Sequence, residues 1–114
     1  MLTVGQCISL LKTDSPYLHV VVQDNCGNNY FVNNVWIDDR GRRVYIVSVE
    51  DDNNFWNDGA LFNQLESYKE RLEVRFIAYA KDGSRVITEL ELDNFGNRVY
   101  FNDIDQDVFM IYSK

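Results

Sequence analysis

Residues 91–101 read ELDNFGNRVYF and residues 36–46 read WIDDRGRRVYI, so the chain contains two similar segments. At an offset of 55 residues, five of the twelve positions in 35–46 and 90–101 are identical: Asp38/Asp93, Gly41/Gly96, Arg43/Arg98, Val44/Val99 and Tyr45/Tyr100. Each copy sets a polar, glycine-containing segment between two apolar stretches, which is the pattern of a hairpin. The repeated segment therefore predicts two equivalent hairpins, the first with a four-residue loop at 38–41 closed by a left-handed glycine.

The segments around the two hairpins follow the same order. Apolar periodicity and turn residues predict two helices at 3–13 and 58–71, and strands at 18–23, 30–37, 43–49, 72–79, 85–92 and 98–104. The sequence thus predicts one domain, residues 1–114, with an internal repeat of residues 1–50 and 58–107. The predicted fold is α+β: two αβββ units related by a pseudo-two-fold axis, forming an antiparallel sheet with two packed helices.

Local signals support several of these boundaries. Thr3 followed by Gln6 is a capping box that starts the first helix, and Asp58 is the expected N-cap of the second. The first unit has one residue more between its two turn glycines than the second, and its apolar alternation changes parity between Val32 and Val35. An inserted residue that keeps both ends facing the core is a β-bulge, which we place at Asn33-Asn34.

The last apolar run, VFMIY at 108–112, has no counterpart in the first unit. Because five apolar residues near a chain end need burial, we expect an extra strand there. It would pair with a sheet edge in its own chain or in a second copy, which would make a homodimer. Side chains of alternate parity in this strand should both find apolar neighbours.

The assumed loop length also predicts cross-strand neighbours. Val35 should face Val44 inside, with Trp36 opposite Arg43 on the outer side. In the second hairpin Glu91 should lie opposite Arg98. An aromatic ring or a carboxylate are both favourable partners for arginine, at roughly 0.2–1 kcal/mol.

Composition disfavours several classes of function. The net charge of −7 disfavours binding to nucleic acid or to an anionic membrane, because both are negative, whereas it suits a basic partner. Apolar runs are far shorter than the roughly 20 residues of a membrane span, and no secretory signal is recognised. Two cysteines, Cys7 and Cys26, form no disulfide framework, so a cytoplasmic protein with reduced thiols is expected.

Residues suited to catalysis or metal binding are sparse. His19 is the single histidine and has the parity of a solvated strand position. Asp103, Asp105 and Asp107 begin like a calcium loop, but Val108 replaces the required glycine and no glutamate ends the motif. Acidic residues also crowd the linker at 50–58, which is typical of a solvated loop. We therefore predict no catalytic residue, no metal and no cofactor.

Aromatic and basic residues give the best candidates for a partner surface. The outward sheet face should carry Trp36, Arg43, Tyr45, Arg98 and Tyr100. Arginines interleaved with aromatics can stack bases, although the same pattern also arises when cross-strand pairs merely stabilise a hairpin. Phe55 and Trp56, within the acidic linker, are either a hydrophobic staple for the second helix or an aromatic anchor for a partner.

The opening TVGQCISLLK, followed by VVVQDNCGNNYFV, resembles small proteins of phages and mobile elements. These begin T-V-G-E-L-I-x-x-L and continue with a strand, a D-x-x-G turn and another strand. Gln6 and Cys7 replace the usual Glu-Leu pair here. The resemblance covers about the first 50 residues, and it implies an accessory protein of a bacterium or its phage without specifying a reaction.

Three functions follow, in order of preference. The first is a non-catalytic protein-interaction or accessory protein with an unknown protein partner. The second is a nucleic-acid-binding module that uses the arginine and aromatic sheet face, which the acidic charge disfavours. The third is an enzyme that uses paired carboxylates, for which no spacing in the sequence provides support.

Overall fold

A computed structural model describes residues 2–12, 17–50, 56–80, 82, 86–101 and 106–113. Its elements, in chain order, are β1 (Leu2–Thr3), α1 (Val4–Leu11), β2 (His19–Gln23), β3 (Asn29–Ile37), β4 (Arg43–Val49), α2 (Asp58–Leu65), β5 (Glu73–Tyr79), β6 (Val86–Phe101) and β7 (Gln106–Ser113). Strands β2 to β4, the start of β5 and both helix starts lie within a residue or two of the positions predicted from the sequence.

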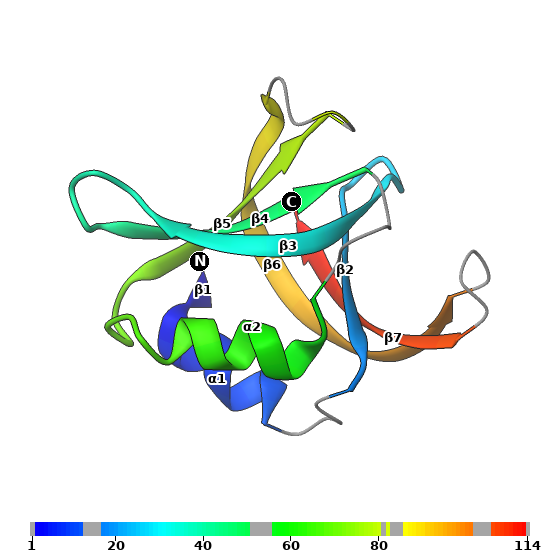
Figure 1. Ribbon diagram of the computed structural model, residues 1–114, viewed down its shortest axis with the longest axis horizontal. Helices are drawn as coiled ribbons and strands as arrows, with labels where there is room; N and C mark the ends of the chain where they lie inside the picture. The colour runs from blue at the N-terminus through cyan, green and yellow to red at the C-terminus, as the bar shows by residue number, and fades with distance from the viewer. Residues whose placement is uncertain are drawn as a thin grey trace.

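The sheet closes on itself. Strands β2 to β7 follow one another around a six-stranded barrel in chain order, and β1 adds a short pairing to β5 (Figure 1). Neighbours are antiparallel except at two seams, β4 with β5 and β2 with β7, where they are parallel. The predicted α+β fold, an antiparallel sheet with two packed helices, is therefore wrong. Residue alternation does not distinguish an open sheet with one covered face from a barrel, because both bury every second side chain.

Strand β6 is the main departure from the predicted repeat. It runs without interruption from Val86 to Phe101, across the segment 93–96 where a second hairpin was expected. Its first part pairs with β5 up to Glu91, and its second part pairs with β7 from Leu92 onward. Register shifts on both sides of residues 94–95 let the long strand bend between the two partners. This change of partner within one strand closes the barrel.

The C-terminal apolar run forms β7, as predicted, and pairs within its own chain. One edge of β7 bonds to β2 and the other to β6. Phe109 and Ile111 point into the main core, whereas Val108 and Met110 join a second cluster outside the barrel. Both parities of the strand are therefore buried, which explains why the whole run is apolar.

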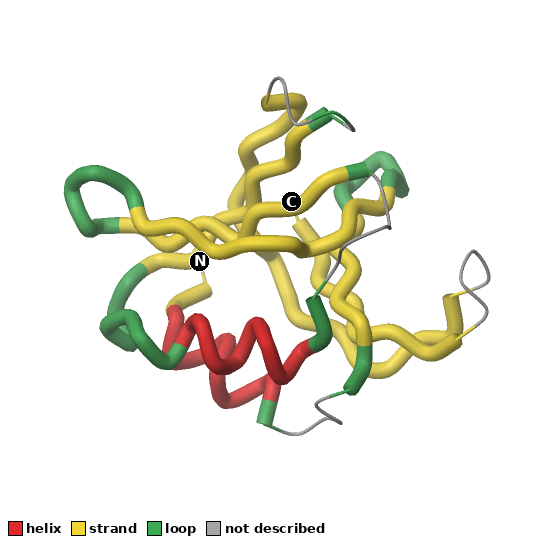
Figure 2. The backbone as a smooth tube through the Cα atoms, viewed as in Figure 1, coloured by secondary structure: helices red, strands yellow, loops and turns green. Residues whose placement is uncertain are grey.

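Both helices lie on the same side of the barrel (Figure 2) and pack against each other. Their apolar faces join the inward side chains of the strands in a single core. In α1 the capping box is present: Gln6 N–H donates to Thr3 Oγ1 (3.3 Å), and Thr3 N–H donates to Gln6 Oε1 (2.9 Å).

Helix α2 is shorter than predicted and begins differently. Its N-cap is Asn57, whose side-chain oxygen accepts from Ala60 N–H at 2.8 Å. Asp58, the expected cap, is instead the first helical residue and is buried. After Leu65 the chain tightens into turns, with Tyr68 N–H donating to the carbonyl of Leu65 at 3.1 Å. These short-range bonds use the carbonyls that a longer helix would have used.

The predicted bulge in β3 is confirmed. The register with β4 shifts between Val32 and Asn34, so Val32 and Val35 are both buried although three positions separate them. The predicted hairpin register is wrong, however. Ile37 pairs with Val44, which leaves residues 38–42 between the two strands and brings Trp36 opposite Tyr45 rather than Arg43. The loop does contain the expected left-handed glycine, Gly41, at φ 65°.

Candidate functional site

The outward side chains of β3, β4, β5 and β6, here called the outer face, form the most distinctive surface of the described residues. Because strand residues alternate, each strand sends every second side chain to this face. One cross-strand row contains Trp36, Tyr45, Arg75 and Glu91, and the next contains Asn34, Val47, Ile77 and Glu89. Aromatic, apolar and charged groups are thus brought together from distant parts of the chain.

Trp36 and Tyr79 form the aromatic centre of the outer face. Their ring centroids lie 5.5 Å apart with an interplanar angle of 67°, an edge-to-face arrangement that is favourable for aromatic pairs. The two residues come from β3 and β5, so they meet across β4. Val47 of β4 is only 3% exposed although it points outward, whereas Trp36 remains 43% exposed. A large indole surface is therefore held in place and presented to solvent.

A hollow of about 210 Å³ lies beside this aromatic pair. We call it the Trp36 hollow. It is lined by Asn33, Asn34, Trp36, Val47, Val49 and Tyr79. The β3 bulge supplies the two amides and the aromatic pair supplies the rings. The Asn34 side chain is fixed by accepting from Val35 N–H at 2.9 Å. The size and lining suit a single side chain with an apolar body.

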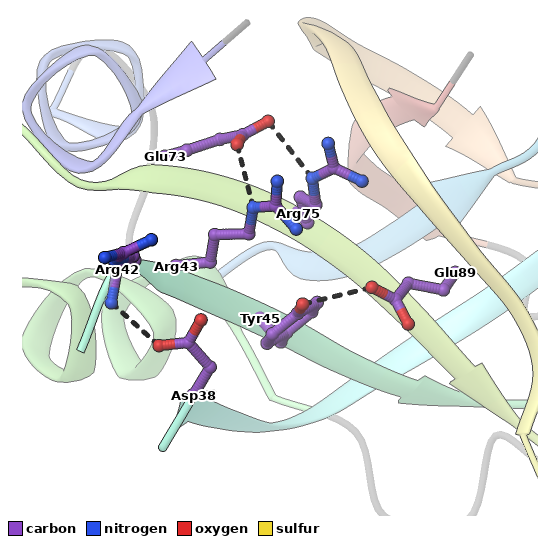
Figure 3. Close-up of polar contacts among 7 residues, drawn as sticks. All are labelled: Asp38, Arg42, Arg43, Tyr45, Glu73, Arg75 and Glu89. Atoms are coloured by element: carbon purple, nitrogen blue, oxygen red, sulfur yellow. Dashed lines mark hydrogen bonds and ion pairs between the residues drawn. The ribbon is translucent and has the colours of Figure 1, made fainter. Parts of the chain in front are cut away.

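The arginines of the outer face are bound by a carboxylate (Figure 3). Glu73 accepts from Arg43 Nε at 3.2 Å and from Arg75 Nε at 3.1 Å, and its side chain is only 12% exposed. The Tyr45 hydroxyl donates to Glu89 Oε1 at 3.0 Å. Burial, and then this bond to Glu89, raise the pKa of Tyr45 above its usual value. The positive charges of this face are thus paired internally.

The structure brings together only part of the predicted partner surface. Trp36, Arg43 and Tyr45 share the outer face as expected from their parity. Arg98 and Tyr100 lie instead on the far end of β6, opposite Phe109 and Asp107 of β7. In Figure 1 that end of the β6–β7 pair and the β3–β4 loop lie on opposite sides of the molecule. The predicted Glu91–Arg98 pair is also wrong, because Glu91 pairs with Arg75.

Trp56 lies before α2 rather than on the outer face. The backbone N–H of Trp56 donates to the carbonyl of Val32 at 2.7 Å, and the backbone carbonyl of Trp56 accepts from Val20 N–H at 3.0 Å. The side chain is partly buried and packs against the main core. Trp56 therefore helps to fix the start of α2, in line with the staple interpretation. Phe55 lies outside the described residues.

Tyr79 and the valines of the hollow were not among the residues singled out from the sequence. Tyr79 has the same strand parity as Arg75 and Ile77, so its outward direction could have been read from the alternation. Its contact with Trp36 could not, because that contact requires β4 and β5 to be parallel neighbours.

Other reactive groups of the described residues are dispersed. His19 Nδ1 lies 2.8 Å from Gln106 Nε2, and burial lowers the pKa of His19. Burial raises the pKa of the Cys7 thiol to about 12, whereas Cys26 is exposed in a turn, and both thiols are free. Within the described ranges no three histidine, cysteine or acidic residues are placed to hold a metal ion. Asp103 and Asp105 of the calcium-like motif lie outside those ranges.

A larger hollow of about 760 Å³ runs along α1. It is lined by Leu2, Thr3, Gly5, Gln6, Ile8, Ser9, Leu10, Lys12, Glu70 and Arg71. Its lining mixes both charges and contains no aromatic ring. The Trp36 hollow, with two rings meeting at an angle, is chemically more specific.

Comparison of the chain with family models, curated proteins and solved structures gave no match. In the part of the chain that the structure describes, none of the helices has the length and apolar character required to cross a membrane.

Proposed function

We propose that this chain is a non-catalytic protein-interaction module, an accessory factor of a bacterium or phage, which binds its partner through the outer face. The observation that carries the proposal is the exposed Trp36, held edge-to-face on Tyr79 beside the Trp36 hollow. Tryptophan and tyrosine beside a small pocket are typical of the residues that dominate binding energy at protein interfaces. The bacterial or phage setting is supported by the TVGQCISLLK resemblance, and a cytoplasmic location by the two free thiols.

The barrel supports this role mechanically. Strand β4, at the centre of the outer face, is bonded along its length to β3 on one side and to β5 on the other, and the inward side chains beneath it are packed in the main core. A binding surface on such a scaffold loses little conformational entropy when a partner docks. The orientation of Trp36 is further restricted by its ring contact with Tyr79.

Charge on the outer face argues against the nucleic-acid alternative. Binding of single strands needs free positive charge along the backbone path as well as stacking rings. Here Glu73 pairs with both Arg43 and Arg75, and with Glu89 and Glu91 nearby the three carboxylates of this face outnumber its two arginines. With a net charge of −7, the chain favours a protein partner.

The carboxylate-enzyme alternative has no support on the outer face, and Asp51 and Asp52 of the acidic linker lie outside the described residues. Glu73 is held by two arginines, and Glu89 accepts from a tyrosine. Neither carboxylate is among the residues that line the Trp36 hollow. A general acid or base must reach its substrate within hydrogen-bonding distance. These carboxylates are engaged in structural contacts.

The oligomer predicted through the last strand is not part of this proposal. Both edges of β7 bond within the chain, to β2 and β6. Strand β7 therefore has no free edge to offer to a second copy.

Affinity capture from the source cell tests the proposal. The bait is the whole chain, compared with Trp36→Ser and with Tyr100→Ser, which removes an aromatic that is 54% exposed on the far end of β6. We expect a partner protein to be recovered by the wild type and by Tyr100→Ser, and lost by Trp36→Ser. Circular dichroism must show that both variants fold. Equal recovery by all three baits would refute the outer face as the binding surface.

A further inference from the structure

The chemistry of the Trp36 hollow indicates which side chain it binds. Its accessible apolar surface comes mainly from Val49 on β4 and from the Trp36 and Tyr79 rings, which meet at an angle of 67° above the nearly buried Val47. Asn33 and Asn34 line the β3 side. An alkyl stem can lie on Val49, while a ring face favours a cation within about 6 Å of its centroid. The lining therefore suits a long side chain with an apolar stem and a charged head.

The charges around the hollow determine the sign of that head. The outer face carries Glu73, Glu89 and Glu91 against Arg43 and Arg75, so the carboxylates outnumber the arginines. Glu89 lies in the same cross-strand row as Val47, two strands away. From the usual spacing of strands, the backbones of these two residues are roughly 10 Å apart. That separation is about one Debye length at roughly 0.1 M salt, so at that ionic strength Glu89 attracts a cation near the hollow weakly.

We propose that the Trp36 hollow binds an arginine side chain of the partner protein; this rests on the function proposed above. The planar guanidinium stacks on one ring of the Trp36–Tyr79 corner, and its stem covers Val49. The Asn33 amide is placed at the wall of the hollow, where its oxygen can accept an N–H of the guanidinium. The net charge of −7 attracts a basic partner to this face.

Arginine is preferred to lysine because two rings that meet at an angle favour a planar group such as the guanidinium. A guanidinium can stack flat on one ring while its edge donates toward the amide, whereas an ammonium group is a hydrated point charge without a face. An anionic side chain is disfavoured by the surrounding carboxylates. A purely apolar side chain would fill the hollow without using the ring faces or the charge.

Titration with short peptides, monitored by NMR of the intact chain, tests this inference. The probes are acetyl-Gly-X-Gly-amide peptides, where X is arginine, citrulline, lysine or leucine. Citrulline has nearly the shape of arginine but no charge. The chain has two tryptophans, and the spectrum of Trp36→Leu identifies the indole N–H signal of Trp36. We expect that signal and the Asn33 amide signals to shift with the arginine peptide, and about 3- to 10-fold weaker binding of citrulline.

Two variants separate the contributions. Trp36→Leu should abolish binding of the arginine peptide, and Glu89→Gln should weaken it about twofold to threefold while leaving citrulline binding unchanged. Equal binding of arginine and citrulline, strongest binding of leucine, or no shift with any peptide would each overturn the inference. If cell capture still depends on Trp36 in those cases, only the arginine assignment fails. If the arginine peptide binds but capture does not depend on Trp36, the proposed function fails instead.

Discussion

Residues 36–46 and 91–101 share five identities at matched positions but have opposite conformations. The first segment reverses the chain through the β3–β4 loop, and the second runs through the middle of β6. In the first, Gly41 adopts φ 65°, and its N–H donates to the carbonyl of Asp38 at 2.9 Å. In the second, Gly96 has no positive φ and lies against β7 instead. The two matched glycines thus serve different purposes.

The difference shows that the pairing strand decides between hairpin and extended chain. A β-carbon added at Gly96 would lie 2.6 Å from Tyr112 Cε2 and 3.1 Å from the carbonyl oxygen of Met110. At Gly41 the nearest atom to an added β-carbon is 4.0 Å away, and only the backbone conformation requires glycine. Strand β7 pairs antiparallel along the second segment and holds it extended, whereas the two halves of the first segment pair with each other. Local sequence permits both conformations, and tertiary pairing selects one.

The largest expected effect comes from removing the strand that keeps the second segment extended. Deleting residues 108–114 removes four buried apolar side chains, Val108, Phe109, Met110 and Ile111. At roughly 1.5–3 kcal/mol each, their loss approaches the whole stability of a typical domain. We expect the truncated chain to show no cooperative thermal transition. Deleting only Lys114 is the control, and a truncated chain that melts at the wild-type temperature would contradict the role assigned to β7.

A smaller effect is expected where Gly96 meets β7. Gly96→Ala should destabilise the fold by about 1–3 kcal/mol through overpacking against Tyr112, measured by urea denaturation. Because the shortest contact is to the Tyr112 ring, adding Tyr112→Ala should recover part of the loss in a double-mutant cycle. Strictly additive effects would mean that the ring is not what excludes a side chain at this position.

A still smaller effect is expected at the matched glycine of the hairpin. Gly41→Ala should cost about 1–2 kcal/mol, because an L-residue is strained at positive φ. Gly41→Asn should be close to neutral, since asparagine enters this conformation more readily than alanine. Gly96→Asn should be as harmful as Gly96→Ala or worse. If asparagine is tolerated equally at both glycines, the contrast between conformation and close packing is incorrect.

The smallest expected effect concerns acid stability at the matched aspartates. The bond from Arg42 N–H to Asp38 Oδ1, at 2.7 Å, is the main cause that lowers the pKa of Asp38. A lowered pKa means that the folded state binds the carboxyl proton of Asp38 less tightly than the unfolded state does. The ionised Asp38 carboxylate therefore stabilises the fold above the unfolded pKa, and this stabilisation disappears as pH falls through the folded pKa. Asp38→Asn should therefore lessen the loss of melting temperature on acidification below about pH 4. The same substitution at Asp93, in the extended segment, is the matched control. Equal pH profiles for Asp38→Asn and the wild type would contradict the assignment.

Features governed by short-range chemistry were predicted well. The capping box at Thr3, the left-handed Gly41 and the β3 bulge all follow from residue type and parity within a few positions. The apolar run at 108–112 also predicted a buried strand, because an apolar run of both parities needs burial on both faces.

Features governed by distant partners were not predicted. Closure of the barrel depends on β6 changing partners and on the parallel seams, which leave no local pattern. Prediction of the site was limited for the same reason. Parity correctly placed Trp36, Arg43 and Tyr45 on one face, but the assumed loop length was wrong, so the predicted cross-strand partner of Trp36 was wrong. Arg98 and Tyr100 were grouped with them because the two segments were assumed to be equivalent, and the contact of Trp36 with Tyr79 depends on a parallel seam.

The parallel seam between β2 and β7 also constrains how the chain reaches this fold. It pairs His19 with Val108 and Gln23 with Tyr112, so it joins segments separated by most of the chain. Such distant pairing has a large loop-closure entropy and forms slowly. During synthesis the barrel cannot close until β7 has left the ribosome, because β7 is the last of the barrel strands along the chain and joins β6 to β2. Until then the edges of β2 and β6 that β7 will cover remain open to other chains, and an intermediate of this kind is a natural substrate for chaperones.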